Sequence, residues 1–195
     1  MQVAWIGSFP KSGSTWLRYI VNHILFGEGG KLKPPAVRDS VPDIHDYCEP
    51  MRYTWQGLYV LKTHLSFNDL PSRMQTRSFI YVIRHPLDVV DSALAYLAPS
   101  PGDRHLIIDS FCKYGSVDPW LSYLKYGSLE ENIKSWCGSV GNHHNRLIFR
   151  YEDMLADPHK HVKLLGHHFD VKLSENHISN IVEQTSFKSL KKIEN

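Results

Sequence analysis

Short apolar segments alternate along the chain with longer segments of helical periodicity. Apolar runs bounded by turn-forming residues predict buried strands at 2–7, 59–63, 79–84 and 147–151. Periodic stretches of helical length predict helices at 14–26, 87–97, 104–114, 128–140, 158–169 and 174–184. Pro86 suits the first turn of the second of these helices. Residues 27–57 are rich in proline and glycine and predict a long loop with at most a short helix.

Strands that alternate with helices predict an α/β fold, in which a parallel sheet is covered by helices on both faces. The chain has 195 residues, of which 42% are hydrophobic, and this is enough for one sizeable core. We therefore expect a single domain over residues 1–195.

The charge balance and the cysteines narrow the class of protein. A formal net charge of +2 argues against a nucleic-acid surface, so any anion site must be local. Cys48, Cys112 and Cys137 are odd in number and widely spaced, which favours reduced thiols over a disulfide framework. The sequence also shows no signal segment and no apolar run of membrane-spanning length. These features predict a soluble, cytoplasmic protein that acts away from membranes.

Polar residues follow each predicted strand, at the edge where open α/β sheets bind their ligands. Four groups of residues take this position: Lys11 and Ser12; Lys62, Thr63 and His64; Arg84; and Tyr151, Glu152 and Asp153. Four strands that each deliver polar groups to one edge predict a functional site there.

The first of these groups belongs to the loop SFPKSGSTW, Ser8–Trp16, between the first strand and the first helix. Free amides at a helix amino end attract an anion, and Gly13 would allow a phosphate to approach closely. Ser14 and Thr15 add hydroxyl donors, and Lys11 adds a full charge. The alternative is an ordinary strand-to-helix turn whose hydroxyls cap the helix.

Arg84 and Ser92 suggest a second phosphate site. They are separated by eight positions, so Ser92 could face the strand end that carries Arg84, and the two side chains could hold a phosphate between them. The alternative is that Arg84 pairs with a nearby carboxylate such as Asp88, while Ser92 only packs.

Several segments together resemble the motifs of sulfotransferases that use 3′-phosphoadenosine 5′-phosphosulfate (PAPS). They are FPKSGSTWL, LKTHL, YVIRHPLDVVDSALAY, FRYEDMLADP and QTSFKSL, in this order and at similar separations. The resemblance covers nearly the whole chain. It implies a P-loop-type sheet, a transferase that needs no metal, and PAPS as the sulfonate donor, with 3′-phosphoadenosine 5′-phosphate (PAP) as the product.

The same resemblance assigns roles to individual residues. Lys11 would contact the 5′-phosphate and the bridging oxygen, while Ser12, Gly13, Ser14 and Thr15 would cradle that phosphate. Arg84 and Ser92 would hold the 3′-phosphate. Contacts to the adenine would come from Trp16, Tyr151, Thr185 and Phe187.

His64 matches the family's catalytic base, and Lys62 beside it would be a second catalytic cation. An imidazole with its ordinary pKa of about 6.5 can take a hydroxyl proton near neutrality. The pairs His143–His144, His159 with His161, and His167–His168 have no partners at zinc-finger spacing, so we interpret them as solvated faces. Glu152 and Asp153 are expected to favour a helix start rather than to act as acids.

The acceptor is expected to be a small molecule with a hydroxyl group, bound by loops 27–57 and 98–127. Aromatic residues in and beside these loops suit a flat or apolar acceptor; they are Tyr47, Tyr53, Trp55, Tyr96, Phe111, Trp120 and Tyr123. They could equally be core and loop anchors. The stretch GSLEENIKSW resembles a segment of bacterial sulfotransferases that modify glycopeptides, which would imply a glycosylated acceptor. A homodimer is compatible with this interpretation.

Two other classes stay open. A P-loop kinase or NTPase should carry its lysine after the glycine of the loop and a carboxylate for Mg²⁺ on a later strand, whereas Lys11 here precedes Gly13 and the strand YVIR ends in a cation. Family members usually continue beyond TSF into a basic, glycine-containing segment over the cofactor, whereas this sequence stops at Asn195. Either the sequence covers part of a protein or the member is shortened. A catalytically silent nucleotide-binding module is therefore the second alternative.

Overall fold

The computed structural model describes residues 1–27, 34–45, 52–71, 74–98, 100–117, 126–138 and 145–191. Its core is a four-stranded parallel sheet in the order β2-β1-β3-β4. The strands are β1 (Gln2–Ser8), β2 (Tyr59–Thr63), β3 (Gln75–Ile83) and β4 (Arg146–Arg150). Since all four strands are parallel, their carboxyl ends meet at one edge, as the sequence predicted.

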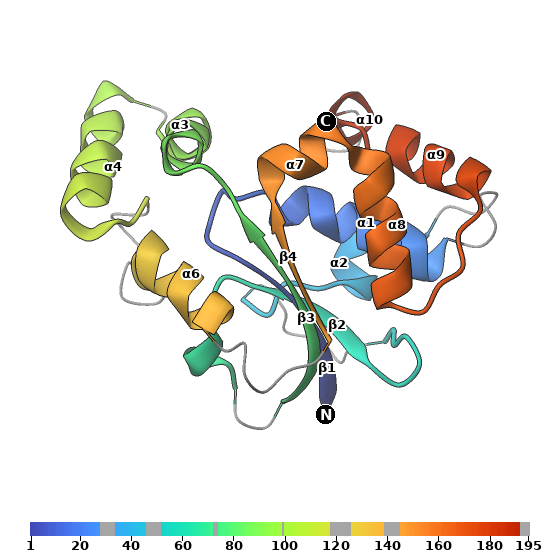
Figure 1. Ribbon diagram of the computed structural model, residues 1–195. Helices are drawn as coiled ribbons and strands as arrows, with labels where there is room; N and C mark the ends of the chain where they lie inside the picture. The colour runs from blue at the N-terminus through green and yellow to red at the C-terminus, as the bar shows by residue number, and fades with distance from the viewer. Residues whose placement is uncertain are drawn as a thin grey trace.

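Helices pack on both faces of the sheet (Figure 1). On one face lie α1 (Ser14–Phe26), α8 (Pro158–His168) and α9 (Glu175–Gln184), whose apolar residues share a core with β1 and β3. On the other face, η1 (Phe67–Asp69) and α6 (Leu129–Gly138) cover Trp5, Phe79 and Tyr81. The remaining helices are α2 (Val37–Ser40), α3 (Pro86–Leu97), α4 (Pro101–Tyr114), α7 (Tyr151–Ala156) and α10 (Phe187–Lys191).

The predicted fold class and the predicted strands and helices are confirmed, with shifts at some boundaries. β3 begins four residues earlier than expected, because the exposed, polar start of the strand carries no apolar signal. α4 begins three residues earlier, because Pro101 occupies its first turn and Ser100 forms a reciprocal capping box with Asp103. α7 and α10 were not predicted; both are too short to show periodicity.

Two other predictions from the sequence meet different outcomes. His161 is not on a solvated face: it is buried, its Nδ1 lies 2.7 Å from the carbonyl of Asp157, and its ring contacts Phe149 edge-on. Cys112 and Cys137 are free thiols. Cys48 and the His143–His144 pair lie outside the described residues, as do Tyr47, Trp120 and Tyr123.

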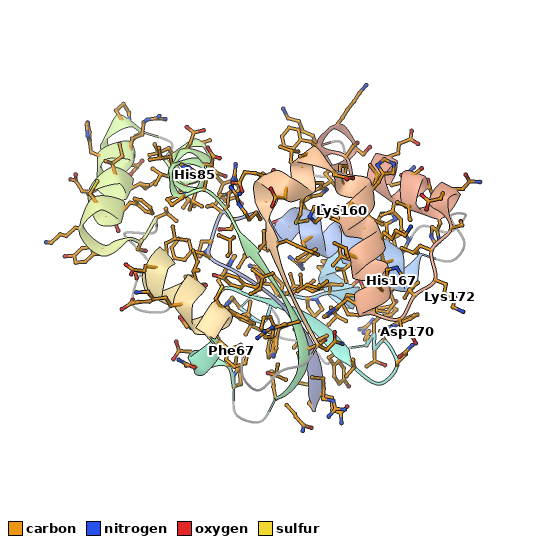
Figure 2. The ribbon with its side chains drawn as sticks, viewed as in Figure 1. Phe67, His85, Lys160, His167, Asp170 and Lys172 are labelled. Carbon is orange, nitrogen blue, oxygen red and sulfur yellow. The ribbon has the colours of Figure 1, made fainter. Side chains whose placement is uncertain are left out.

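Trp136 is the bulky side chain that α6 packs against the sheet. It is fully buried, its ring stacks on Tyr81, and its Nε1–H donates to Leu65 O over 3.0 Å. Phe67, labelled in Figure 2, meets the same ring edge-on. A single aromatic residue therefore joins α6, the sheet and the chain that follows β2.

We predict that Trp136→Ala destabilises the fold by about 3–5 kcal/mol, the usual cost of deleting a buried aromatic side chain. Denaturant unfolding measures this. Leu106→Ala is the control, because Leu106 is 48% exposed and its truncation should change the free energy of unfolding by less than about 0.5 kcal/mol. Equal losses in the two variants would contradict the role given to Trp136.

Candidate active site

The loop after β1 has the backbone of an anion cradle. Lys11 and Gly13 both have positive φ, 65° and 101°, and this turns the chain sharply into α1. α1 has no side-chain cap and no acidic residue in its first turn, so its amino end keeps its positive potential. Ser12 of the loop and Ser14, the first residue of α1, are buried, whereas Thr15 is exposed.

Tyr151 covers this loop from the end of β4. A Cβ atom added to Gly13 would lie 2.5 Å from Tyr151 Cδ2, so the ring rests directly on the glycine. The same ring meets Trp16 edge-on at 5.8 Å. The Tyr151 side chain therefore requires glycine at position 13, in addition to the requirement set by the backbone.

Arg84 connects the end of β3 to Tyr151 and to the loop after β1. Its guanidinium lies over the Tyr151 ring at 4.5 Å, and its Nη1–H donates to Lys11 O over 3.0 Å. The alternative pairing with Asp88 does not form: among the described residues, the ion pairs do not include one between Arg84 and Asp88. Ser92 lies half-buried in the second turn of α3, and no hydrogen bond between described residues joins it to Arg84.

A hydrogen bond from Glu152 holds the start of α3. Glu152 Oε1 accepts the His85 N–H over 2.8 Å, and Figure 2 shows His85 where β3 passes into α3. Glu152 and Asp153 are in the first turn of α7, as expected for a helix start. Glu152 thus has a structural role that joins α7 to α3.

Three buried polar atoms at this end of the sheet lack a partner among the described residues. They are Ser12 Oγ, Trp16 Nε1 and Arg84 Nε. Each can donate a hydrogen bond, and buried donors are normally satisfied. Together with the uncapped helix end, they fit a ligand that brings several acceptor oxygens or nitrogens, such as a phosphorylated nucleotide.

Lys11, Thr185 and Phe187 make other contacts within the protein or lie exposed. Lys11 Nζ lies over the ring of Tyr96 at 3.6 Å, at the far end of α3. The Thr185 hydroxyl donates to Ile181 O over 2.8 Å and thus closes the end of α9. Phe187 is 79% exposed at the start of α10. Their contacts with a nucleotide remain predictions.

His64 follows β2 and is oriented by the end of β1. Its Nδ1 lies 2.7 Å from Ser8 O, and a carbonyl can only accept, so Nδ1 carries the hydrogen. The lone pair is therefore on Nε2. Burial, and secondarily the charge of Lys62, lower the pKa of His64 to about 3, so the ring is neutral across the neutral pH range.

Lys62 and Asp43 form a buried ion pair behind His64. Burial alone would raise the pKa of Asp43, but the charge and hydrogen bond of Lys62, together with the His45 backbone N–H and the charge of His64, lower it. Asn132 adds support from α6: its Nδ2 donates to His64 O over 2.9 Å and to Tyr126 O over 3.1 Å, and it accepts from the Tyr81 hydroxyl over 2.6 Å.

Asp43, His45, Tyr126 and Asn132 were not singled out from the sequence. No local pattern marks them: only Asp43 pairs with β2, and Ile44 and His45 lie in a turn. Their relation to His64 depends on the tertiary fold.

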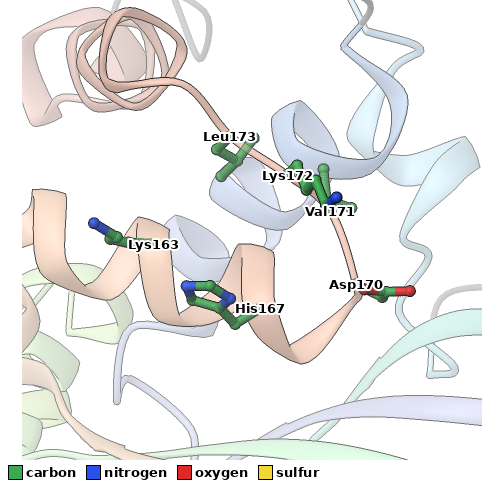
Figure 3. Close-up of a pocket in the computed structure, with 6 residues that line it drawn as sticks. All are labelled: Lys163, His167, Asp170, Val171, Lys172 and Leu173. Carbon is green, nitrogen blue, oxygen red and sulfur yellow. The ribbon is translucent and has the colours of Figure 1, made fainter.

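A separate pocket of about 240 Å³ lies between α8 and the segment that follows it (Figure 3). It is lined by Lys163, His167, Asp170, Val171, Lys172 and Leu173. Its charged side chains are exposed. It shares no residue with the strand-end site.

A family model described as sulfotransferase domain matches residues 2–195. The chain belongs to the sulfotransferase family. Sulfotransferase 1A1 of Mus musculus is 30% identical over 203 residues, which cover 95% of this chain and 66% of that protein. The chain thus spans slightly less than two thirds of this relative's length.

Solved structures share the fold. Mouse sulfotransferase SULT7A1 complexed with PAP has a TM-score of 0.69 at 22% identity, covering 97% of this chain and 66% of that one. Retinol dehydratase in complex with androsterone and PAP has a TM-score of 0.63 at 18% identity, covering 96% and 65%. Among the described residues of the present chain, no helix is long and apolar enough to cross a membrane, and no group of His, Cys, Asp and Glu suits a metal ion.

We predict that Gly13→Ala destabilises the protein more than Gly57→Ala does. Both glycines have positive φ, but a Cβ at Gly57 meets nothing within 4 Å. Gly57→Ala should therefore cost only the backbone term of about 1–2 kcal/mol, whereas Gly13→Ala must also displace Tyr151. Thermal or denaturant unfolding of both variants tests this, and equal losses would contradict the close approach of Tyr151.

We also predict that His64 makes the free energy of unfolding depend on pH. The unfolded ring titrates near its ordinary pKa of 6.5 and the folded ring near 3, so the unfolded chain binds the extra proton between these values. Stability should therefore fall as the pH is lowered through this window. His64→Gln should flatten that slope in unfolding experiments, and an unchanged slope would contradict the buried, neutral ring.

Proposed function

We propose that this chain transfers a sulfonate group from PAPS to a hydroxyl of a small-molecule acceptor. The observation that supports it best is that three groups lie at adjacent strand ends in a member of this family. They are the uncapped amino end of α1, the Arg84 guanidinium, and the His64 imidazole with its lone pair on Nε2. The first two suit separate phosphates of one nucleotide. The third suits an acceptor hydroxyl.

In the proposed complex, the backbone and hydroxyls of Ser12, Gly13, Ser14 and Thr15 hold the 5′-phosphate. Arg84 and Ser92 hold the 3′-phosphate, and Trp16, Tyr151, Thr185 and Phe187 contact the adenine. Trp16 Nε1, Arg84 Nε and Ser12 Oγ gain the partners that they lack among the described residues. Lys11 leaves the ring of Tyr96 and neutralises the charge that develops on the leaving phosphate.

The acceptor hydroxyl must lose a proton during transfer, and His64 is the proposed base that takes it. The sulfonate passes from a phosphate oxygen to the acceptor oxygen, which loses its proton to His64 Nε2, and PAP leaves with the negative charge. A pKa near 3 makes the ring a weak base in the free protein. A bound anionic nucleotide would raise that pKa and strengthen the base. Lys62, already paired with Asp43, would act as a nearby fixed charge.

The acceptor is proposed as a small apolar molecule with a hydroxyl group. Tyr126 and Tyr96 lie close to His64 and Lys11 respectively and could line its site. The fold neighbour with bound androsterone is compatible with this choice. A cytosolic location is part of the proposal.

Calorimetry tests nucleotide choice, and we expect PAP to bind in preference to ATP–Mg²⁺. Arg84→Met should weaken PAP about ten- to hundredfold, the value of a hydrogen bond to a charged group. Adenosine 5′-phosphate is the matched ligand control: without a 3′-phosphate, it should be nearly insensitive to Arg84→Met. Preference for ATP–Mg²⁺ would favour a kinase or NTPase and overturn the proposal.

Transfer of labelled sulfate to a panel of phenols and steroid alcohols tests the chemistry. His64→Gln should lower the rate about 10²–10⁴-fold, the usual contribution of a general base. PAP affinity should change little, because His64 does not belong to the cradle. PAP binding without transfer to any acceptor would instead indicate the silent nucleotide-binding module.

A further inference from the structure

The segment before His45 runs beside β2 as a short additional strand. Asp43 and Lys62 form a parallel bridge, in which Lys62 N–H donates to Pro42 O over 2.9 Å and Ile44 N–H donates to Lys62 O over 3.1 Å. Ile44 and His45 then form a turn, in which the His45 backbone N–H donates to Asp43 Oδ1 over 3.1 Å. At the end of β2, Asp43 contacts Lys62 and the His45 ring contacts His64.

The ring of His45 reaches the backbone of His64. His45 Nε2 lies 3.3 Å from the His64 backbone N and 3.4 Å from Thr63 Oγ1. The His64 N–H can only donate, so His45 Nε2 must be the acceptor. The Thr63 hydroxyl already accepts from Leu65 N–H over 3.0 Å, which leaves its own hydrogen for the same Nε2. His45 is thus a neutral imidazole with its hydrogen on Nδ1.

His64 is consequently held at three points by three different elements. Its Nδ1–H donates to Ser8 O at the end of β1, its carbonyl accepts from Asn132 of α6, and its backbone N–H donates to His45. The two imidazole planes lie within 9° of parallel, and both rings meet Tyr126 edge-on. Two of the three anchors act on the His64 backbone: Asn132 holds its carbonyl, and His45 accepts its N–H.

We propose that His45 is a positioning residue for the candidate base His64. It holds the Thr63–Leu65 turn so that His64 Nε2 faces the acceptor, and it does not itself touch the reacting atoms. Asp43 supports it, because Asp43 Oδ1 accepts the His45 backbone N–H over 3.1 Å while Oδ2 holds Lys62. Since this role rests on the proposed function, its test needs a readout that works without activity.

Two amide substitutions give a matched pair. The glutamine side chain in His45→Gln can place its oxygen near the site of the imidazole Nε2, whereas the shorter side chain in His45→Asn reaches only the site of Nδ1. His45→Gln should keep kcat within about threefold of the parent, because the hydrogen bond is preserved. His45→Asn and His45→Ala should lower kcat about ten- to hundredfold, as expected for a displaced catalytic group. The dissociation constant of PAP should not change.

The readout without activity is the ring tautomer in the parent protein. Long-range ¹H–¹⁵N spectra should show His45 with its hydrogen on Nδ1, and hydrogen exchange at the His64 amide should speed up in His45→Asn but not in His45→Gln. A hydrogen on His45 Nε2, or a His45→Asn variant as active as His45→Gln, would overturn the inference. A parent that transfers no sulfate would refute the proposed function alone, and the tautomer and amide exchange would then decide this inference.

Discussion

The close approach of Tyr151 to Gly13 is the contact on which the proposed nucleotide half of the site depends. The ring rests where a Cβ would stand, and its face carries the Arg84 guanidinium, which in turn bonds to Lys11 O. Three chain segments, after β1, β3 and β4, are therefore fixed by one side chain. The parallel sheet brings these segments to one edge, and the tyrosine sets their spacing there.

The other half of the site is held by polar contacts in a buried setting. Lys62 and Asp43 are both largely withdrawn from water, and a buried charge is tolerable only when it is paired. Asp43 therefore neutralises the buried Lys62 ammonium near His64. The same burial keeps the His64 ring neutral, so the hydrogen on Nδ1 and the lone pair on Nε2 follow from the environment rather than from the residue type.

The sequence predicted the sheet, its main helices and the strand ends that carry polar residues, because periodicity and the geometry of parallel strands are local or general rules. It could not predict that Tyr151 covers Gly13, since that contact joins residues far apart in the chain. It also could not predict that Lys62 is paired with Asp43, or that His45 bonds to the His64 amide. The prediction for His161 was wrong for the same reason. The sequence of mixed polarity predicted a solvated histidine, whereas its ring packs on Phe149 of β4.

The two halves of the site differ in how their residues are encoded. The cradle lies in continuous motifs, where Gly13 and Arg84 have a required chemistry at a fixed place, and a resemblance can therefore find them. The support for His64 comes from a loop segment, a helix and the end of a strand, each adding one hydrogen bond. Because any acceptor of suitable reach could make each bond, the residue types there are less constrained than the geometry. The orientation of the proposed base His64 therefore depends on the geometry of these three bonds rather than on the residue types that make them.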